Sequence, residues 1–134
     1  MTKLISIEGI GPVNAEKLQG AGVSSVEGLL KRGADPAGRE ELADATGISG
    51  KRILEWVNMA DLFRIKGVSE EYAELLEAAG VDTVPELAQR NPENLHAKLG
   101  EVNAEKKLVR RLPALSQVRD WVGQAKDLPR AISY

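Results

Sequence analysis

The stretch Ile7-Glu8-Gly9-Ile10-Gly11-Pro12-Val13-Asn14-Ala15-Glu16-Lys17-Leu18 is the most informative part of the chain. Gly9 and Gly11 flank one apolar residue, and a helical apolar pattern follows them. Glycine adopts backbone conformations that other residues avoid and allows another surface to come close. The pattern therefore predicts a tight hairpin between two helices, with the first amides of the second helix facing outward. Such a helix end attracts anions, phosphate above all.

The same pattern occurs again in Ile65-Lys66-Gly67-Val68-Ser69-Glu70-Glu71-Tyr72-Ala73-Glu74-Leu75-Leu76, with Ser69 in place of the second glycine. Matches continue along both copies as far as Trp56 and Trp121. The second copy carries an insertion near 106–116 that contains Pro113, a residue that ends or kinks helices. An internal repeat of this kind predicts two related units, 1–62 and 63–134.

Each copy has the pattern of four or five short helices. Two further hairpins are predicted, at Thr46-Gly47-Ile48-Ser49-Gly50 and at Leu99-Gly100-Glu101-Val102-Asn103, the latter with a single glycine. Both tryptophans fall within apolar helical faces, which favours core positions over exposed stacking platforms. No segment alternates with the period of a strand, so we expect an all-α protein.

Composition narrows the function classes for these 134 residues. There is no cysteine and only one histidine, His96, so neither a thiolate site nor a multi-histidine metal centre is expected. No nucleophile–base pair or carboxylate pair stands out, and we expect a protein that is not an enzyme and needs no cofactor. The N-terminus lacks the pattern of a signal peptide, and no apolar run approaches the ~20 residues of a membrane span. A soluble cytoplasmic protein without a membrane partner is the expectation.

The pattern apolar-x-Gly-Ile-Gly-x-x-x-Ala-x-x-Leu-x-x-x-Gly resembles the helix-hairpin-helix motif. Over nearly its whole length, the chain is similar to a bacterial family catalogued only as a domain of unknown function. The segments that carry this similarity are 7–12, Leu54-Glu55-Trp56-Val57-Asn58, 61–68 and Asn94-Leu95-His96-Ala97-Lys98-Leu99. The resemblance implies two tandem helix-hairpin-helix (SAM-like) units related by internal duplication.

The resemblance also implies a chemistry, because in DNA-binding members the hairpin amides hold a phosphate and a nearby basic side chain adds charge. Such a hairpin can also hold a monovalent cation through its carbonyls. Val13 stands where binding members often carry Lys or Arg, and carboxylates crowd the third hairpin from Ser69 to Glu74. The candidate nucleic-acid contacts are therefore Gly9, Ile10, Gly11 and Lys17 from the first hairpin, and Gly47, Ile48, Ser49, Gly50, Lys51 and Arg52 from the second. Ile10 itself is expected to pack inward.

Charge is unevenly distributed along the second copy. Acidic residues are in excess over 61–93 and basic residues over 98–119. The spacing of Lys106, Lys107, Arg110 and Arg111 predicts that several share one helical face. They form either a phosphate-binding stripe or a solvated face that meets the acidic helix 70–77 of the same chain or of another copy. The opposite charges of the two segments would suit self-association.

Two functions remain after these exclusions. The first is sequence-independent binding of duplex DNA through the phosphate backbone, using the first two hairpins. The second is a protein–protein interaction or scaffold module that kept the fold and lost the phosphate chemistry. The intact hairpins favour the first, whereas the net charge of −2, Val13 and the acidic third hairpin favour the second.

Overall fold

The computed structural model describes residues 2–134, and within them it is all-α, with eight α-helices, one short 3-10 helix and no strand. None of the helices in this range has both the length and the apolar character needed to cross a membrane. The helices are η1 (Leu4–Ser6), α1 (Gly11–Gly20), α2 (Val26–Arg32), α3 (Pro36–Thr46), α4 (Gly50–Leu62), α5 (Glu70–Ala78), α6 (Val84–Ala88), α7 (Pro92–Lys106) and α8 (Leu115–Asp127).

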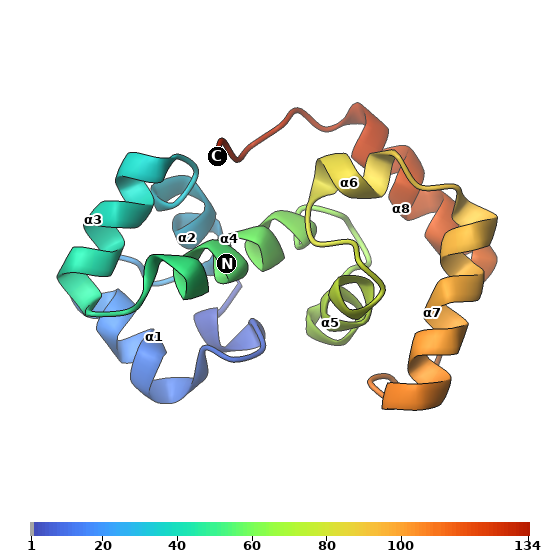
Figure 1. The fold of residues 1–134 in the computed structure, drawn as a ribbon, viewed down its shortest axis with the longest axis horizontal. Coiled ribbons are helices and arrows are strands. Elements are labelled where there is room, and N and C mark those ends of the chain that lie inside the picture. Colours follow the sequence, from blue (N-terminus) through green and yellow to red (C-terminus); the bar gives the residue numbers. More distant parts are fainter. Residues whose placement is uncertain (1) are drawn as a thin grey trace. The chain divides into compact units, whose positions relative to one another are not determined.

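The chain forms two compact units that divide between Asp61 and Leu62 (Figure 1). The first runs up to Asp61 and also includes Ala131–Tyr134, and the second is Leu62–Arg130. Residues 131–134, which the sequence division placed in the second unit, thus lie in the first.

The first unit builds its core from the apolar sides of α1 to α4. Its side chains of lowest exposure include Leu18, Leu29, Leu42 and Ile53. Polar side chains define where its helices begin, because a side-chain oxygen accepts from an amide that the helix leaves without a partner. Ser25 Oγ accepts from the Gly28 amide at 3.0 Å, and Asp35 Oδ1 accepts from the Gly38 amide at 2.7 Å.

The second unit repeats this capping at α6 and α7. Thr83 Oγ1 accepts from the Glu86 amide at 3.4 Å, and Asn91 Oδ1 accepts from the Asn94 amide at 2.9 Å. Helix α8 packs against α6 and α7, and the completely buried Leu76, Leu87 and Leu99 lie in the core of this unit.

The turns after α1 and α5 also repeat each other. Arg32 Nη1 donates to the Ala21 carbonyl at 3.1 Å, and Arg90 Nη2 donates to the Gly80 carbonyl at 3.0 Å. Each arginine therefore closes the turn that follows the first helix of its unit. The two arginines are equivalent in the repeat, but their acceptors differ by one position, because Ala21 corresponds to Ala79 and not to Gly80.

The last residues attach to the first unit through Arg39, a buried arginine of α3. Its Nη1 donates to the Gly33 carbonyl and its Nη2 to the Ser133 carbonyl, both at 2.8 Å. The Ser133 amide donates to the Ala34 carbonyl at 2.7 Å, and Ile132 is buried. A four-residue tail thus completes the first unit, a role that its sequence did not suggest.

The fourth predicted hairpin, at 99–103, is wrong. Helix α7 continues through Gly100 and ends only at Lys106. Leu99 and Val102 are buried on its inner side, so the packing of this face outweighs the weak helix propensity of one glycine. The turn between α7 and α8 lies instead at 107–114, within the predicted insertion. The first hairpin also differs in part, because only the three-residue η1 precedes it.

Candidate functional site

The first hairpin has the backbone that its two glycines predicted. Gly9 has a φ of 92° and Gly11 a φ of 66°, both in the left-handed region. Ile10 between them is only 2% exposed, which confirms that it packs inward. Helix α1 begins at Gly11, and no side chain caps its first amides. Pro12 has no N–H, and the Ile10 amide donates to the Ile7 carbonyl at 3.3 Å, so Gly11 and Val13 supply the amides at this helix start.

The second hairpin, between α3 and α4, uses several of its amides internally. The Gly47 amide donates to the Ala43 carbonyl at 2.9 Å, and the Ile48 amide donates to Thr46 Oγ1 at 3.2 Å. Ser49 Oγ accepts from the Arg52 amide at 3.3 Å. Ile48 is buried like Ile10. Of the predicted backbone contacts, Ile10, Gly47 and Ile48 therefore already have protein partners for their amides.

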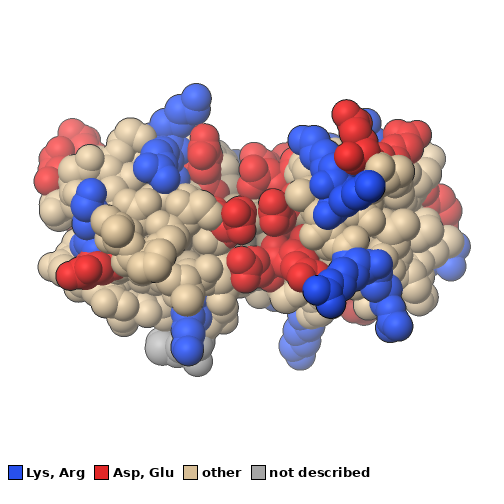
Figure 2. Space-filling view, turned by 90° about the horizontal axis from the view of Figure 1, so that it is seen from below, with Lys and Arg blue, Asp and Glu red and all other residues tan. Residues whose placement is uncertain are grey.

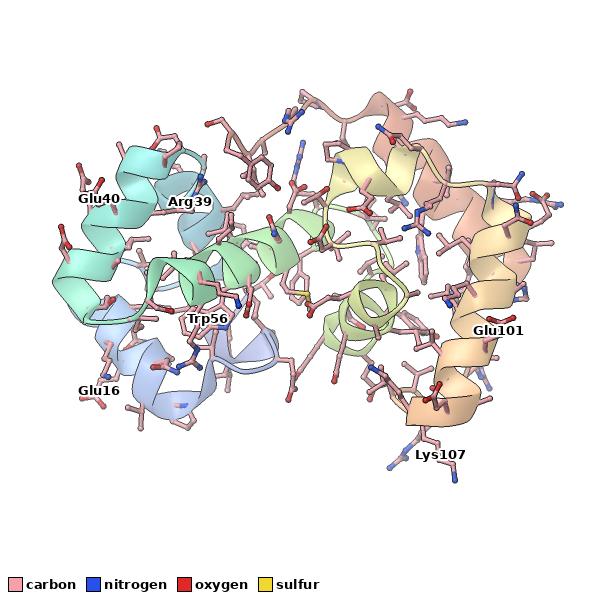
Figure 3. The ribbon with its side chains drawn as sticks, in the orientation of Figure 1. Glu16, Arg39, Glu40, Trp56, Glu101 and Lys107 are labelled. Carbon is pink, nitrogen blue, oxygen red and sulfur yellow. The ribbon has the colours of Figure 1, made fainter. Side chains whose placement is uncertain are left out.

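Arg52 brings the two hairpins together. It lies in the first turn of α4, and its Nη2 donates to the Gly9 carbonyl at 3.4 Å. The guanidinium carbon lies 5.0 Å from the centre of the Trp56 ring, within the range of a cation–π contact. Trp56, which extends from α4 toward the first hairpin, is 3% exposed and belongs to the core as predicted (Figure 3).

This arrangement was not predicted from the sequence. Arg52 and Trp56 are four residues apart on one helix, and this spacing indicates that their side chains lie next to each other. Its consequence is that a positive charge from the second hairpin lies against the first. A monovalent cation at the Gly9 carbonyl would meet this guanidinium.

Two further predicted cations, Lys17 and Lys51, are exposed. Within residues 2–134 neither takes part in an ion pair. Acidic side chains are exposed on the same elements, among them Glu16 on α1, which points away from the unit in Figure 3. Val13 is 67% exposed. The face is therefore of mixed charge, with an apolar side chain where a basic one would strengthen phosphate binding.

The third hairpin contains one exposed cation, Lys66, directly before Gly67. The Gln124 side chain forms two hydrogen bonds with the backbone of this hairpin. It accepts from the Lys66 amide at 2.8 Å and donates to the Lys66 carbonyl at 3.0 Å. Tyr72 packs on Trp121 with ring centres 5.3 Å apart. Glu70 and Glu71 lie in the first turn of α5. The acidic residues are placed at the start of this helix, as the sequence suggested.

The prediction that several of Lys106, Lys107, Arg110 and Arg111 share one helical face is wrong. Lys106 is the last residue of α7, Lys107 is left-handed with a φ of 53°, and both arginines lie in the loop that follows. All four side chains are exposed. We refer to these four residues as the basic turn. Basic side chains gather over this end of α7 in Figure 2, and Lys107 extends outward from it in Figure 3.

Three side chains, two from α7 and one from α5, form hydrogen bonds with the backbone between Val109 and Pro113. The Asn103 amide group donates to the Val109 carbonyl at 3.1 Å and accepts from the Val109 amide at 2.9 Å. Tyr72 Oη donates to the Arg111 carbonyl at 3.2 Å. His96 Nε2 lies 3.1 Å from the Pro113 carbonyl, so this histidine has a structural partner.

Two further features of the described residues are the distribution of possible metal ligands and one surface hollow. No group of three or more His, Cys, Asp or Glu side chains in residues 2–134 could hold a metal ion. A hollow of about 280 Å³ in the first unit is lined by Lys3, Leu4, Ile5, Ala15, Gln19 and Ser24. This lining contains no carboxylate.

The protein is thus all-α within residues 2–134, with left-handed glycines in the turns between helices. The first two hairpins present exposed side chains of both charges. The chain belongs to the family described as Domain of unknown function (DUF4332), whose model matches residues 8–128. The match covers nearly the whole chain and both units. No solved structure matches the chain.

Proposed function

We propose that the chain is a non-enzymatic helix-hairpin-helix protein that binds the phosphate backbone of duplex DNA through the first two hairpins of its first unit. Two tandem units of this type are part of the proposal. They are supported by the repeated glycine corners and by the matching arginine contacts of Arg32 and Arg90.

The observation that carries the proposal is the contact between Arg52 and the Gly9 carbonyl. It joins the first hairpin and the start of α4 on one face. A phosphate approaching the amides at Gly11 would therefore also meet the guanidinium of Arg52. Lys17 and Lys51 can add phosphate contacts without breaking an ion pair. Contacts of this kind position a protein on DNA without reading its bases.

The mixed charge of this face sets the expected strength. Glu8, Glu16 and Glu55 are exposed on the same elements as the proposed contacts. We therefore expect weak binding, with a dissociation constant of roughly 10⁻⁴ to 10⁻⁶ M at physiological salt, and a steep loss of affinity as salt increases.

The test uses paired charge variants of the full chain. Lys17→Glu with Lys51→Glu should abolish measurable duplex binding in a fluorescence anisotropy titration. The matched control is Lys31→Glu with Lys126→Glu, which makes the same charge change at exposed positions outside the face. Equal losses in both pairs, or none in either, would contradict the proposed contact.

A gain of function gives an independent test. Val13→Lys places a basic side chain at an exposed position beside the uncapped start of α1. Duplex binding should become several-fold tighter, and the slope of log affinity against log salt should steepen by about 0.9, the value for one phosphate contact. An unchanged slope would show that the first hairpin does not face DNA.

A second candidate, a protein-interaction module, is favoured by exposed apolar groups in the first unit. Val13 is 67% exposed and Ile5 is 53% exposed, and Ile5 also lines the hollow described above. If the protein shows no duplex binding at micromolar concentration and low salt, this candidate takes precedence.

A further inference from the structure

The basic turn of the second unit has no role in the hairpin contacts proposed above. Lys106, Lys107, Arg110 and Arg111 are all exposed, and none forms an ion pair within residues 2–134. Three other basic residues of this unit are ion-paired: Arg119 with Glu93 at 2.9 Å, Arg90 with Glu86 at 3.5 Å and Lys98 with Glu101 at 4.0 Å. The four cations are therefore gathered where no carboxylate neutralises them through a direct contact.

The turn that carries these cations is fixed by hydrogen bonds. Asn103 holds both the amide and the carbonyl of Val109, and Tyr72 holds the Arg111 carbonyl. The backbone is thereby held at Val109, inside the cluster, and at Arg111, its last residue, while the charged ends of the four side chains remain in solvent. Holding the backbone in advance lowers the entropic cost of binding.

The backbone of Lys107 gives a second observation. Its φ of 53° and ψ of 47° place it in the left-handed region, and among residues 2–134 it is the only residue other than glycine with a positive φ. Glycine is the usual residue at this position, directly after a helix. A lysine there is locally unfavourable, which is typical of positions where a side chain serves a function.

We propose that the basic turn is a second contact for the phosphate backbone of duplex DNA, separate from the hairpin face of the first unit. This inference rests on the proposed function and extends it to the second unit, whose own glycine corner at Gly67 is unsuited to phosphate. Gln124 already occupies the backbone of that corner, and Glu70 and Glu71 follow it. The second unit thus contacts DNA through side-chain charge at its α7–α8 turn.

A polyanion fits this cluster better than a single small anion. No side chain in the turn is a buried polar group aimed at one point, and the four cations extend over six consecutive residues. Phosphates repeated along a duplex can be met by several exposed cations at once, and each contact releases condensed counterions. Lys107 adopts the left-handed conformation at a cost in stability, and this cost is then offset because its side chain adds one more cation for the phosphates.

The experiment compares two double variants of the full chain in duplex titrations at several salt concentrations. Arg110→Gln with Arg111→Gln should make the slope of log affinity against log salt shallower by about 2, since each phosphate that is no longer neutralised reduces the slope by about 0.9. Affinity should fall about tenfold or more near 0.1 M salt. The control, Lys98→Gln with Lys126→Gln, removes the same charge from the same unit and should leave the slope unchanged.

The failure of this inference and that of the proposed function give different results. If Arg110→Gln with Arg111→Gln behaves like its control while Lys17→Glu with Lys51→Glu loses binding, the basic turn is not a DNA contact and the hairpin face stands. If the wild-type protein binds no duplex, both proposals are overturned. If sedimentation without DNA shows a dimer at low salt that the arginine variant loses, the turn binds a second copy and the DNA assignment is wrong.

Lys107→Gly separates stability from binding. Glycine suits a φ of 53°, so the melting temperature should rise by about 4 °C. Duplex affinity should fall in the same variant because one cation is removed. A variant that is more stable and retains full affinity and salt slope would remove Lys107 from the contact.

Discussion

Individual glycines fix the corners of this protein, and the two matched corners differ in how closely a tryptophan approaches. A Cβ atom at Gly9 would lie 3.7 Å from Trp56 Nε1, an ordinary contact distance. At Gly67 it would lie 3.1 Å from Trp121 Nε1, which is crowded. Both residues have a φ above 90°. The same backbone requirement is therefore combined with two different degrees of packing.

This difference makes a paired prediction. Gly9→Ala should lower the free energy of unfolding by about 1–2 kcal/mol, the cost of a side chain in the left-handed region. Gly67→Ala should cost more than Gly9→Ala, because the methyl group must also displace the indole of Trp121. Urea titrations monitored by circular dichroism measure both variants. Equal losses would show that the indole moves away without cost.

At the scale of helices, α7 is the element whose sequence was misinterpreted. Gly100 lies inside it, and a Cβ atom there would meet only Leu112 Cδ1 at 4.0 Å. Since glycine in a helix interior is less favourable than alanine, Gly100→Ala should raise stability by about 0.5–1 kcal/mol. The urea midpoint measures this gain. A loss of stability would mean that the added methyl group disturbs the packing against Leu112.

The pairing of α7 with α8 includes an ion pair that is sensitive to pH. Hydrogen bonding from Arg119 lowers the pKa of Glu93 below its usual value. The folded state therefore binds the proton of this carboxyl less readily than the unfolded chain does. The resulting stabilisation is present above the unfolded pKa and is lost as the pH falls through the folded pKa.

Glu93→Gln should accordingly lower the melting temperature at pH 7 relative to the wild type, and this difference should disappear at an acid pH below the lowered pKa of Glu93. The effect will be small because both side chains are more than half exposed. Thermal melts of the two proteins at both pH values test it. A difference that persists at the lower pH would mean that the glutamate acts through packing and not through its charge.

Much of this architecture could be predicted from local sequence. Ser25, Asp35 and Asn91 precede helices and cap them, as short polar side chains do in many proteins. The fourth hairpin could not be predicted correctly because a single glycine fits both a corner and a helix interior, and only the burial of Leu99 and Val102 decides between them.

The backbone conformation of the candidate site could be predicted from the sequence, but the positions of its side chains could not. The left-handed glycines at 9, 11 and 47 follow from sequence spacing. The position of the Arg52 guanidinium depends on tertiary contacts with Gly9 and Trp56, which no local pattern specifies. For the same reason the basic turn was expected on a helix. Its cations were found from spacing, but the end of α7 depends on Asn103 and the left-handed Lys107.

At the scale of the molecule, the tail Ala131–Tyr134 is the feature that makes the first unit discontinuous in sequence. Removing residues 131–134 leaves the Arg39 Nη2 group without the Ser133 carbonyl, in a side chain that is only 8% exposed. A hydrogen bond to a charged group contributes about 1.5–3 kcal/mol, so the truncated protein should be destabilised by at least that amount.

The measurement is a chemical denaturation of the full chain and the truncated chain. Tyr134→Phe is the control, because it keeps a ring near Arg39 and removes the hydroxyl that donates to Asn58 Oδ1 at 3.0 Å. This control should lose about 1 kcal/mol or less. A truncated protein as stable as the full chain would show that the tail rests on the first unit without stabilising it.

The discontinuity also has a consequence for biosynthesis. A ribosome adds about 5–20 residues per second, so several seconds pass between the translation of residue 61 and that of the tail. During this interval α1 to α3 are already made, but the guanidinium of Arg39 still lacks one of its acceptors. Of the two units described here, the one whose translation begins first is therefore completed second, and a stalled chain would expose an incomplete domain to proteases.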